Sequence, residues 1–355
     1  MNNVLTFLIV AVIKIAVTVG VLLTIVAYTV WLERKVVGRM QNRWGPSRVG
    51  PFGLLQPLAD GLKFIFKEDL TPPYVNRGIY LLAPVLALTM ALTSIALIPI
   101  APNVTVDGVT TPIQITGVLD PSAPHGSSDI NVGLLIILGI TSVGVYGIAL
   151  AGWSSNSKYS LLGSLRASAQ MVSYEVALGL SLIGVLILSQ TFSLRGIVEQ
   201  QQGWFWNWNF FKGGQFIAFF IYLMAAFAET NRIPFDLPEA ETELVAGYHT
   251  EYSAMKFAMF FMAEYANMVT VACLASVLFL GGWSGPVFGP PILHGLLPVF
   301  WFLLRVFCFL FLYIWVRGTL PRFRYDQLMA FSWKFLLPLA LANTVITALI
   351  VALRA

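Results

Sequence analysis

Residues 4–32 form one apolar run, VLTFLIVAVIKIAVTVGVLLTIVAYTVWL, which ends at Glu33, Arg34 and Lys35. A helix needs about 20 apolar residues to cross the hydrocarbon core of a bilayer, so this run is long enough to span it. It is longer than the apolar core of a signal peptide, has no basic segment before it, and shows no small-residue cleavage site. We therefore predict a membrane-spanning helix here.

The composition of the whole chain agrees with this prediction. Of its 355 residues, 57% are hydrophobic and 11% are charged, and the mean hydropathy is +0.78, whereas soluble domains carry about 25% charged residues. The net charge of +4 does not indicate nucleic-acid binding, because the basic residues form no patch interleaved with aromatic side chains. We predict a single polytopic all-α membrane domain over residues 1–355.

Eight apolar runs are candidates for membrane spans. They cover residues 4–32, 79–100, 131–153, 161–189, 213–229, 255–282, 296–317 and 332–353. The fifth run is short for a bilayer, and the fourth has a polar first half. An even number of spans places both termini on the same side of the membrane.

The distribution of basic residues supports eight spans. The alternation assigns four loops to one face of the membrane: 33–78, 154–160, 230–254 and 318–331. Twelve basic residues lie in these loops: Arg34, Lys35, Arg39, Arg43, Arg48, Lys63, Lys67, Arg77, Lys158, Arg232, Arg322 and Arg324. The opposite face holds Arg195, Lys212 and Arg354. Because basic loops stay on the cytoplasmic side, we expect the first face to be cytoplasmic in a bacterial plasma membrane.

The chain offers no pattern of metal ligands. Cys273 and Cys308 lie inside apolar runs and are expected to be buried structural thiols. His125, His249 and His294 are scattered without ligand spacing, so we expect no metal or haem to be bound by this chain.

Residues 51–68, PFGLLQPLADGLKFIFKE, are too polar to span a bilayer. Apolar residues recur on one side of a helix drawn through them, at Leu55, Leu58, Leu62 and Ile65. Polar residues recur on the other side, at Gln56, Asp60, Lys63 and Lys67. This pattern predicts an amphipathic helix lying along the membrane surface. Such a helix either anchors the loop or walls a cavity that opens to lipid, with Asp60 and Lys63 turned towards protein.

Three carboxylates fall inside or at the end of predicted spans: Glu175, Glu229 and Glu264. An acidic side chain near the centre of a bilayer costs about 2.5–3.5 kcal/mol on insertion scales, so such acids usually serve function or are paired. Lys14 and Arg305 are the candidate bases inside the spans, and each would either neutralise an acid or tilt towards an interface.

The loop 230–254 adds a cluster of acids. Its members are Asp236, Glu239, Glu241, Glu243 and Glu251. One possibility is an ordinary solvated loop. The other is a semi-enclosed cluster whose like charges raise carboxylate pKa values and allow proton sharing, and the apolar residues interleaved with the acids favour it.

Residues 204–211, WFWNWNFF, form an aromatic cluster at a membrane edge. Tryptophan and tyrosine are enriched at membrane interfaces, so an interfacial belt is one interpretation. A docking surface for a partner helix is the other.

Several long motifs resemble the H subunit of complex I, the NADH-quinone oxidoreductase. They are GPFGLLQPLADGLK at 50–63, NSKYSLLGSLRASAQMVSYE at 156–175 and ETNRIPFDLPEAETELVAGYHTEY at 229–252, together with Glu33-Arg34-Lys35 and Gly45-Pro46. They occur in order between about residue 31 and about residue 335. Residues 204–211 match no motif of this family.

The resemblance implies an eight-span membrane protein at the heel of the membrane arm, where that arm meets the hydrophilic arm. NADH, FMN and the iron–sulfur clusters would be bound by partner subunits, and this chain would hold no redox centre. It would supply much of the chamber through which a lipid quinone reaches the terminal cluster. It would also begin the series of buried acids that links quinone reduction to proton pumping.

The same resemblance assigns two sets of residues. Those that would line or gate the quinone chamber are Arg34, Arg39, Asp60, Lys63, Arg232 and Phe235. Those that would form the proton path are Glu33, Glu175, Glu229, Glu239, Glu241, Glu243, Glu251 and Glu264.

Three other functions remain open at this stage. A sister complex supplied by ferredoxin, coenzyme F420 or hydrogenase modules would use the same architecture. A stand-alone ion-coupled transporter would use the carboxylates as a cation site, and matching broken helices in the two halves would favour it, but we find no such repeat. A purely structural membrane anchor is disfavoured by Glu175 and Glu264.

Overall fold

The computed structural model describes residues 2–102, 104–106, 109–111, 130–236, 246–288 and 291–353. The long helices are α1 (Asn2–Met40), α3 (Arg77–Ile95), α4 (Gly133–Ser154), α5 (Lys158–Ser189), α9 (Ala254–Phe279) and α10 (Pro291–Thr319). The last span is continuous through α11 (Tyr325–Phe331), the π-helical turn η6 (Ser332–Leu336) and α12 (Leu337–Ala352). Shorter helices are α2 (Gln56–Phe66), α6 (Leu194–Glu199) and α7 (Gln215–Glu229).

The remaining described elements are short. Four 3-10 turns are η1 (Pro51–Gly53), η3 (Phe205–Asn207), η4 (Asn209–Phe211) and η5 (Gly247–His249). Two three-residue strands, β1 (Val104–Val106) and β2 (Val109–Thr111), pair antiparallel between α3 and α4.

Within the described residues, seven helices are long and apolar enough to cross a membrane, which confirms a multi-pass all-α membrane protein. The one predicted span that is not among these seven is the fifth, 213–229, which corresponds to α7 and has 15 residues. At 1.5 Å per residue such a helix reaches about 22 Å, less than the roughly 30 Å of a hydrocarbon core. Gly213 and Gly214 precede it with φ of 56° and 79°, which are not helical values, so α7 begins after them. The eight-span count therefore stays a prediction.

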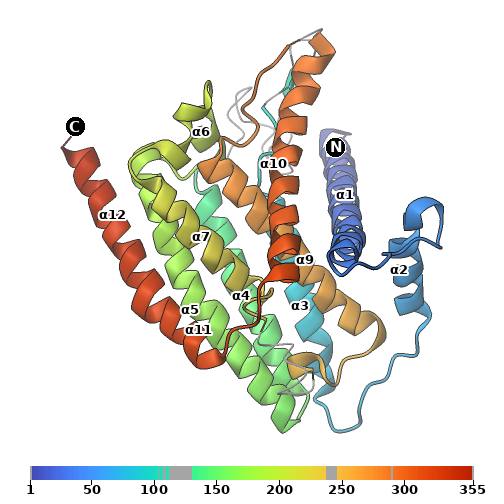
Figure 1. Cartoon of the computed structure of the whole chain (residues 1–355). Helices are drawn as coiled ribbons and strands as arrows, with labels where there is room; N and C mark the ends of the chain where they lie inside the picture. The colour runs from blue at the N-terminus through green and yellow to red at the C-terminus, as the bar shows by residue number, and fades with distance from the viewer. Residues whose placement is uncertain are drawn as a thin grey trace.

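The bundle is built around α9, which packs against α1, α3, α7 and α10 (Figure 1). A second row runs from α3 through α4 and α5 to α12. The helices approach closely where glycine permits it: a Cβ at Gly152 of α4 would overlap the Ser164 side chain of α5. We call the end of the bundle that carries α2, η5 and α11 the basic end, and the end that carries α6, η3 and η4 the opposite end.

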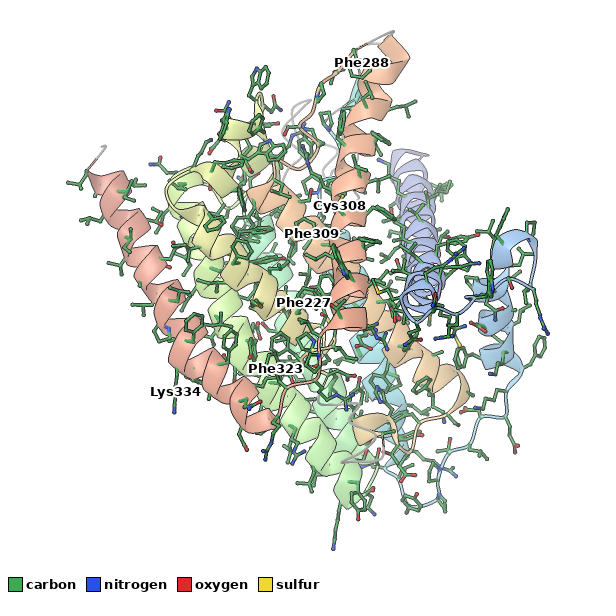
Figure 2. All side chains as sticks on the ribbon, in the orientation of Figure 1. Phe227, Phe288, Cys308, Phe309, Phe323 and Lys334 are labelled. Carbon is green, nitrogen blue, oxygen red and sulfur yellow. The ribbon has the colours of Figure 1, made fainter. Side chains whose placement is uncertain are left out.

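The outer surfaces of the bundle are apolar. Many side chains project outward from the helices (Figure 2). Large hydrophobic residues are exposed on α1 and α12, among them Val12, Val17, Val345 and Leu349. So extended an apolar surface is typical of contact with lipid or with partner subunits. Cys273 is buried as expected, but the expectation for Cys308 was wrong, because its side chain points out of α10 and is exposed.

The predicted amphipathic helix at 51–68 forms as η1 followed by α2. Leu58, Leu62 and Ile65 are exposed on it, as an interfacial helix requires. The break after η1 depends on Gly53, which has φ of 76° and lies so close to Pro46 that a Cβ there would overlap the Pro46 carbonyl oxygen. Only glycine fits that approach, and it directs α2 back towards α1.

Candidate functional site

A buried ionic network joins α1, α7, α9 and α10 at the basic end. The Arg232 side chain, just after α7, places Nη1 3.9 Å from Glu33 Oε2 and Nε 3.4 Å from Glu264 Oε1. Arg317 donates directly to Glu33, and the Tyr265 hydroxyl donates to the same carboxylate at 2.8 Å. The Arg232 guanidinium also lies over the Tyr265 ring, 3.9 Å from its centroid. Two cations thus face two carboxylates in a place where an unpaired charge would be costly.

Two small cavities connect this network to the end of α7. The first, of about 30 Å³, is lined by Glu264 and Glu229, and the second, of about 20 Å³, is also lined by Glu229. Thr230 and Asn267 line both cavities. A cavity above about 10–15 Å³ with polar partners can hold a water molecule. The Glu264 and Glu229 carboxyls are therefore joined by space for water.

Glu175 continues this series. It lies in the middle of α5, and Ser142 of α4 donates a hydrogen bond to it. Thr141, the residue before Ser142, lines the second cavity beside Glu229. The structure thus brings four predicted acids, Glu33, Glu264, Glu229 and Glu175, into one series that leads from the basic end into the bundle.

The amphipathic helix is tied to α1 by charge. Arg34 Nη1 lies 2.7 Å from Asp60 Oδ2, and Gln56 donates to Asp60 Oδ1 at 3.0 Å. Arg34 is half exposed. Lys63 is exposed on α2, and Arg39 is exposed with its guanidinium over the Trp44 ring. Arg34 and Asp60 therefore meet, whereas Lys63 and Arg39 are not brought into that contact.

An open, polar hollow of about 750 Å³ lies beside this junction, and its wall includes Arg34, Arg43, Arg48 and Gln56. Three guanidinium groups around one hollow favour an acidic surface as its occupant.

Phe235 packs in the core of the basic end, between the rings of Tyr174 and Phe323 at centroid distances of 5.7 Å each. The Gln170 amide donates to the carbonyls of Phe235 and Ala228 and so fixes the start of the loop on α5. Asp236, next in sequence, is paired with Arg322 at 3.1 Å.

The other predicted acids are placed elsewhere. Glu251 accepts a hydrogen bond from the Tyr74 hydroxyl at 2.7 Å, which raises the pKa of Tyr74. Glu251 is therefore hydrogen-bonded to the loop between α2 and α3 and is not part of the Glu33–Arg232–Glu264 network. Glu239, Glu241 and Glu243 lie outside the described residues.

His249 is buried in η5, with its Nδ1 3.1 Å from the Ala246 carbonyl oxygen. Burial lowers its pKa to about 4, so it is neutral at physiological pH. Within the ranges that the structure describes, no group of His, Cys, Asp and Glu side chains could hold a metal ion.

Three partners in this site were not predicted from the sequence: Arg317, Tyr265 and Asn267. Arg317 is the last residue of the predicted run 296–317, so a base at that helix end could have been read as a partner for an acid. Lys14 and Arg305 were considered instead, but Arg305 donates to the backbone carbonyls of Gly282 and Ser284. Tyr265 and Asn267 carry no signal in the sequence.

Comparisons with known proteins agree with one another. The family model for NADH dehydrogenase matches residues 13–348. The chain is 76% identical over 356 residues to the second NADH-quinone oxidoreductase H subunit of Koribacter versatilis, covering 100% of both chains. It is 50% identical over 400 residues to the first such protein of Solibacter usitatus, with 98% of each covered. It is 52% identical over 340 residues to the first such protein of Geobacter sulfurreducens, with 96% of this chain and 94% of that one covered.

Proposed function

This chain belongs to the NADH-quinone oxidoreductase H family, whose members are membrane subunits of complex I, and from this premise we propose how its basic end works. The junction of α1, α2 and α9 forms the wall of a chamber for a lipid quinone. The Glu33–Arg232–Glu264 network lies at the polar end of that chamber, and the acids beyond it carry protons into the bundle.

The observation that carries the proposal is the placement of four acids: Glu33 and Glu264 share Arg232, and Glu229 borders a cavity with Glu264. A second water-sized cavity also borders Glu229 and includes Thr141, the neighbour of the Ser142 that donates to Glu175. Carboxyls that are bridged by water can exchange protons, because each bridging water molecule donates one hydrogen bond and accepts another. For Glu239, Glu241, Glu243 and Glu251 the proposed proton-path role rests on the family resemblance alone.

The quinone chamber is supported by the amphipathic helix. A quinone has a polar head on a long apolar tail, so its chamber must open to lipid and end at polar groups. The exposed apolar residues of α2 meet the first requirement, and its Asp60–Arg34 pair meets the second. The proposed wall also includes Arg39, Lys63, Arg232 and Phe235. Phe235 packs in the core, and its role is to hold the segment 230–236 in place.

Coupling follows from the charge balance of the network. Each electron that a quinone accepts is matched by a proton, and the electrons come from iron–sulfur clusters that partner subunits hold with FMN. The network contains two arginines and two glutamates, so a charge that appears beside it changes the proton affinity of Glu33 and Glu264. A proton released or taken up there is passed on through Glu229.

The orientation follows from the basic loops. We place the basic end in the cytoplasm of a bacterium, because twelve basic loop residues lie on that face and three on the other. The hydrophilic-arm subunits then dock at the same end, beside the hollow lined by Arg34, Arg43 and Arg48.

The test is Glu229→Gln in the intact complex reconstituted into vesicles. The amide keeps the shape of the side chain but cannot release a proton, so we expect proton translocation to fall about tenfold or more. Glu199→Gln is the matched control, since Glu199 lies at the opposite end and pairs with Arg195 on the surface. If Glu229→Gln pumps as well as the control, the proposed route through the two cavities is wrong.

The alternatives that the sequence left open are no longer favoured. The three relatives quoted are all named as NADH-quinone oxidoreductase subunits, and the family match covers nearly the whole chain. A stand-alone transporter or a plain anchor does not account for a match of that length.

A further inference from the structure

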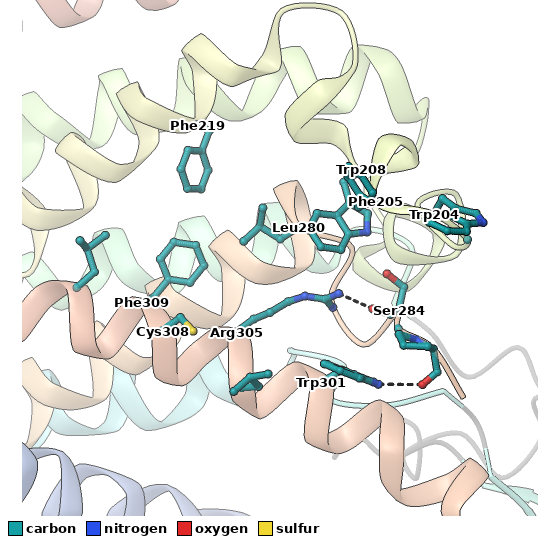
Figure 3. A pocket seen from close by; sticks show the side chains of 15 residues that line it. Trp204, Phe205, Trp208, Phe219, Leu280, Ser284, Trp301, Arg305, Cys308 and Phe309 are labelled. Atoms are coloured by element: carbon teal, nitrogen blue, oxygen red, sulfur yellow. Dashed lines mark hydrogen bonds between the residues drawn. The ribbon is translucent and has the colours of Figure 1, made fainter. Parts of the chain in front are cut away.

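A large pocket lies at the opposite end of the bundle, remote from the acids described above. It has a volume of about 990 Å³ and is bounded by α10, the end of α9 and the aromatic segment 204–211 (Figure 3). Its inner wall is apolar and includes Phe219, Phe309 and Leu312. Pockets of about 300–1,000 Å³ hold ligands of substantial size, so this volume can hold part of a lipid molecule.

One cation lines this otherwise apolar pocket. The Arg305 guanidinium donates to the backbone carbonyls of Gly282 and Ser284 and lies 4.7 Å from the centroid of the Trp208 ring. In the described part of the chain, no carboxylate lies within ion-pair distance of Arg305. Carbonyl groups satisfy donors but do not cancel a charge, and a guanidinium has five N–H donors. Arg305 is therefore able to bind an anion.

A second polar group of the pocket, the Ser284 hydroxyl, lacks a hydrogen-bond partner among the described residues. Ser284 is one of the residues that line the pocket and is 7% exposed. A buried hydroxyl without a partner costs about 1–3 kcal/mol. A ligand with acceptor oxygens beside Arg305 would satisfy it.

The depth of these groups matches the membrane interface. Gly282 and Ser284 closely follow the end of α9 at Phe279, so the Arg305 guanidinium reaches the level at which the helices leave the bilayer. Trp204, Trp208 and Trp301 surround the pocket at this end (Figure 3), as tryptophans do at headgroup level. Leu312, seven residues further along α10, lies about 10 Å deeper at 1.5 Å per residue.

We propose that this pocket binds an anionic phospholipid. Its phosphate contacts Arg305 and Ser284, and an acyl chain runs between Phe219 and Phe309 towards Leu312. Such a lipid combines an anion at interface depth with an apolar chain below it, and the pocket presents its groups in that order. A purely apolar partner helix would leave Arg305 without an anion, and a quinone head carries no charge for Arg305. The segment 204–211 is then both an interfacial belt and one wall of the lipid site.

The experiment uses the intact complex and phosphatidylglycerol with a photoactivatable diazirine in one acyl chain. After illumination, mass spectrometry measures the lipid attached to peptides of α10. Arg305→Gln should lower this labelling about fivefold, the factor that corresponds to roughly 1 kcal/mol for one basic side chain near an anionic lipid surface. Arg195→Gln is the control, because Arg195 lies at the same end but outside the pocket and pairs with Glu199. Labelled phosphatidylcholine should respond less to Arg305→Gln, since its headgroup has no net charge.

A second variant tests the acyl-chain site without changing the cation. Cys308 lines the pocket and is exposed, so Cys308→Phe should fill the space beside Phe309 and also reduce labelling by phosphatidylglycerol. Labelling that is equal in wild type, Arg305→Gln and Cys308→Phe would overturn the proposal. Cross-linking of a partner subunit's helix to the pocket residues in the intact complex would overturn it as well.

Discussion

The Arg232 Nε lies 3.4 Å from Glu264 Oε1, although residues 233–263, with the rest of the acid-rich loop and the first part of α9, separate the two in the chain. Arg232 is 7% exposed and Glu264 12% exposed at the side chain. The same guanidinium reaches Glu33 of α1. One arginine thus holds together the first helix, the loop and the central helix at the proposed quinone chamber.

Replacing Arg232 should therefore lower both the stability of the complex and its quinone reductase activity. Arg232→Gln leaves Glu33 and Glu264 close together with Arg317 as the nearest cation, and breaking a buried ion pair costs about 3–5 kcal/mol. We expect a lower unfolding temperature of the solubilised complex and loss of quinone reductase activity. Arg232→Lys should retain part of both, because it keeps the charge but not the planar fork. Arg195→Gln, at a partly exposed i,i+4 pair worth about 0.3–0.5 kcal/mol, is the control, and equal unfolding temperatures for it and Arg232→Gln would contradict the assigned role.

Asn267 should be needed for proton transfer between the two cavities. It lines both of them together with Glu229. Asn267→Leu keeps a side chain of similar size but removes one polar partner of any water in each cavity, so we expect proton translocation to fall about tenfold or more. Asn267→Ala enlarges the space and leaves room for water, so it should retain more pumping than Asn267→Leu. The reverse order in vesicle pumping assays would show that the cavities do not carry protons.

Asp60 should affect quinone binding without affecting stability. Its pair with Arg34 is partly exposed, and such pairs contribute about 0–1 kcal/mol. Asp60→Asn is expected to raise the KM for quinone severalfold while the unfolding temperature stays within a few degrees of wild type. Glu68→Gln, an exposed acid just after α2, serves as the control. An unchanged KM for Asp60→Asn would remove α2 from the proposed chamber wall.

His249 should make stability depend on pH. Burial lowers its pKa in the folded protein from 6.5 to about 4, so its contribution is complete above pH 6.5 and is lost as the pH falls towards 4. The full loss amounts to about 3 kcal/mol at 1.36 kcal/mol per pKa unit. His249→Gln should show a smaller drop in unfolding temperature between pH 7 and pH 5 than wild type does. Equal drops would indicate that His249 is accessible to protons in the folded state.

Several features follow from short stretches of sequence. The apolar runs identify spans because the gain from placing a side chain in lipid depends on the residue itself and its immediate neighbours. The steps of three and four in 51–68 likewise predicted α2, and the long motifs identified the family, which the comparisons confirm. The ends of the helices followed less closely from the sequence. The span predicted from residue 213 begins at Gln215 as α7, because Gly213 and Gly214 adopt non-helical φ values.

The amino-acid order by itself determined that this protein lies in a membrane, where its helices run, and which acids lie at a depth where charge is costly. Only the tertiary structure decided which base meets which acid. Glu33 pairs with Arg317, 284 residues away, whereas Arg39, on the same helix as Arg34, stacks on Trp44 instead. Phe235 packs in the core and Arg305 faces a pocket near the opposite surface. The physical reason is that lipid burial sums over single residues, whereas an ion pair needs two side chains within about 4 Å, and that distance is set by how whole helices pack.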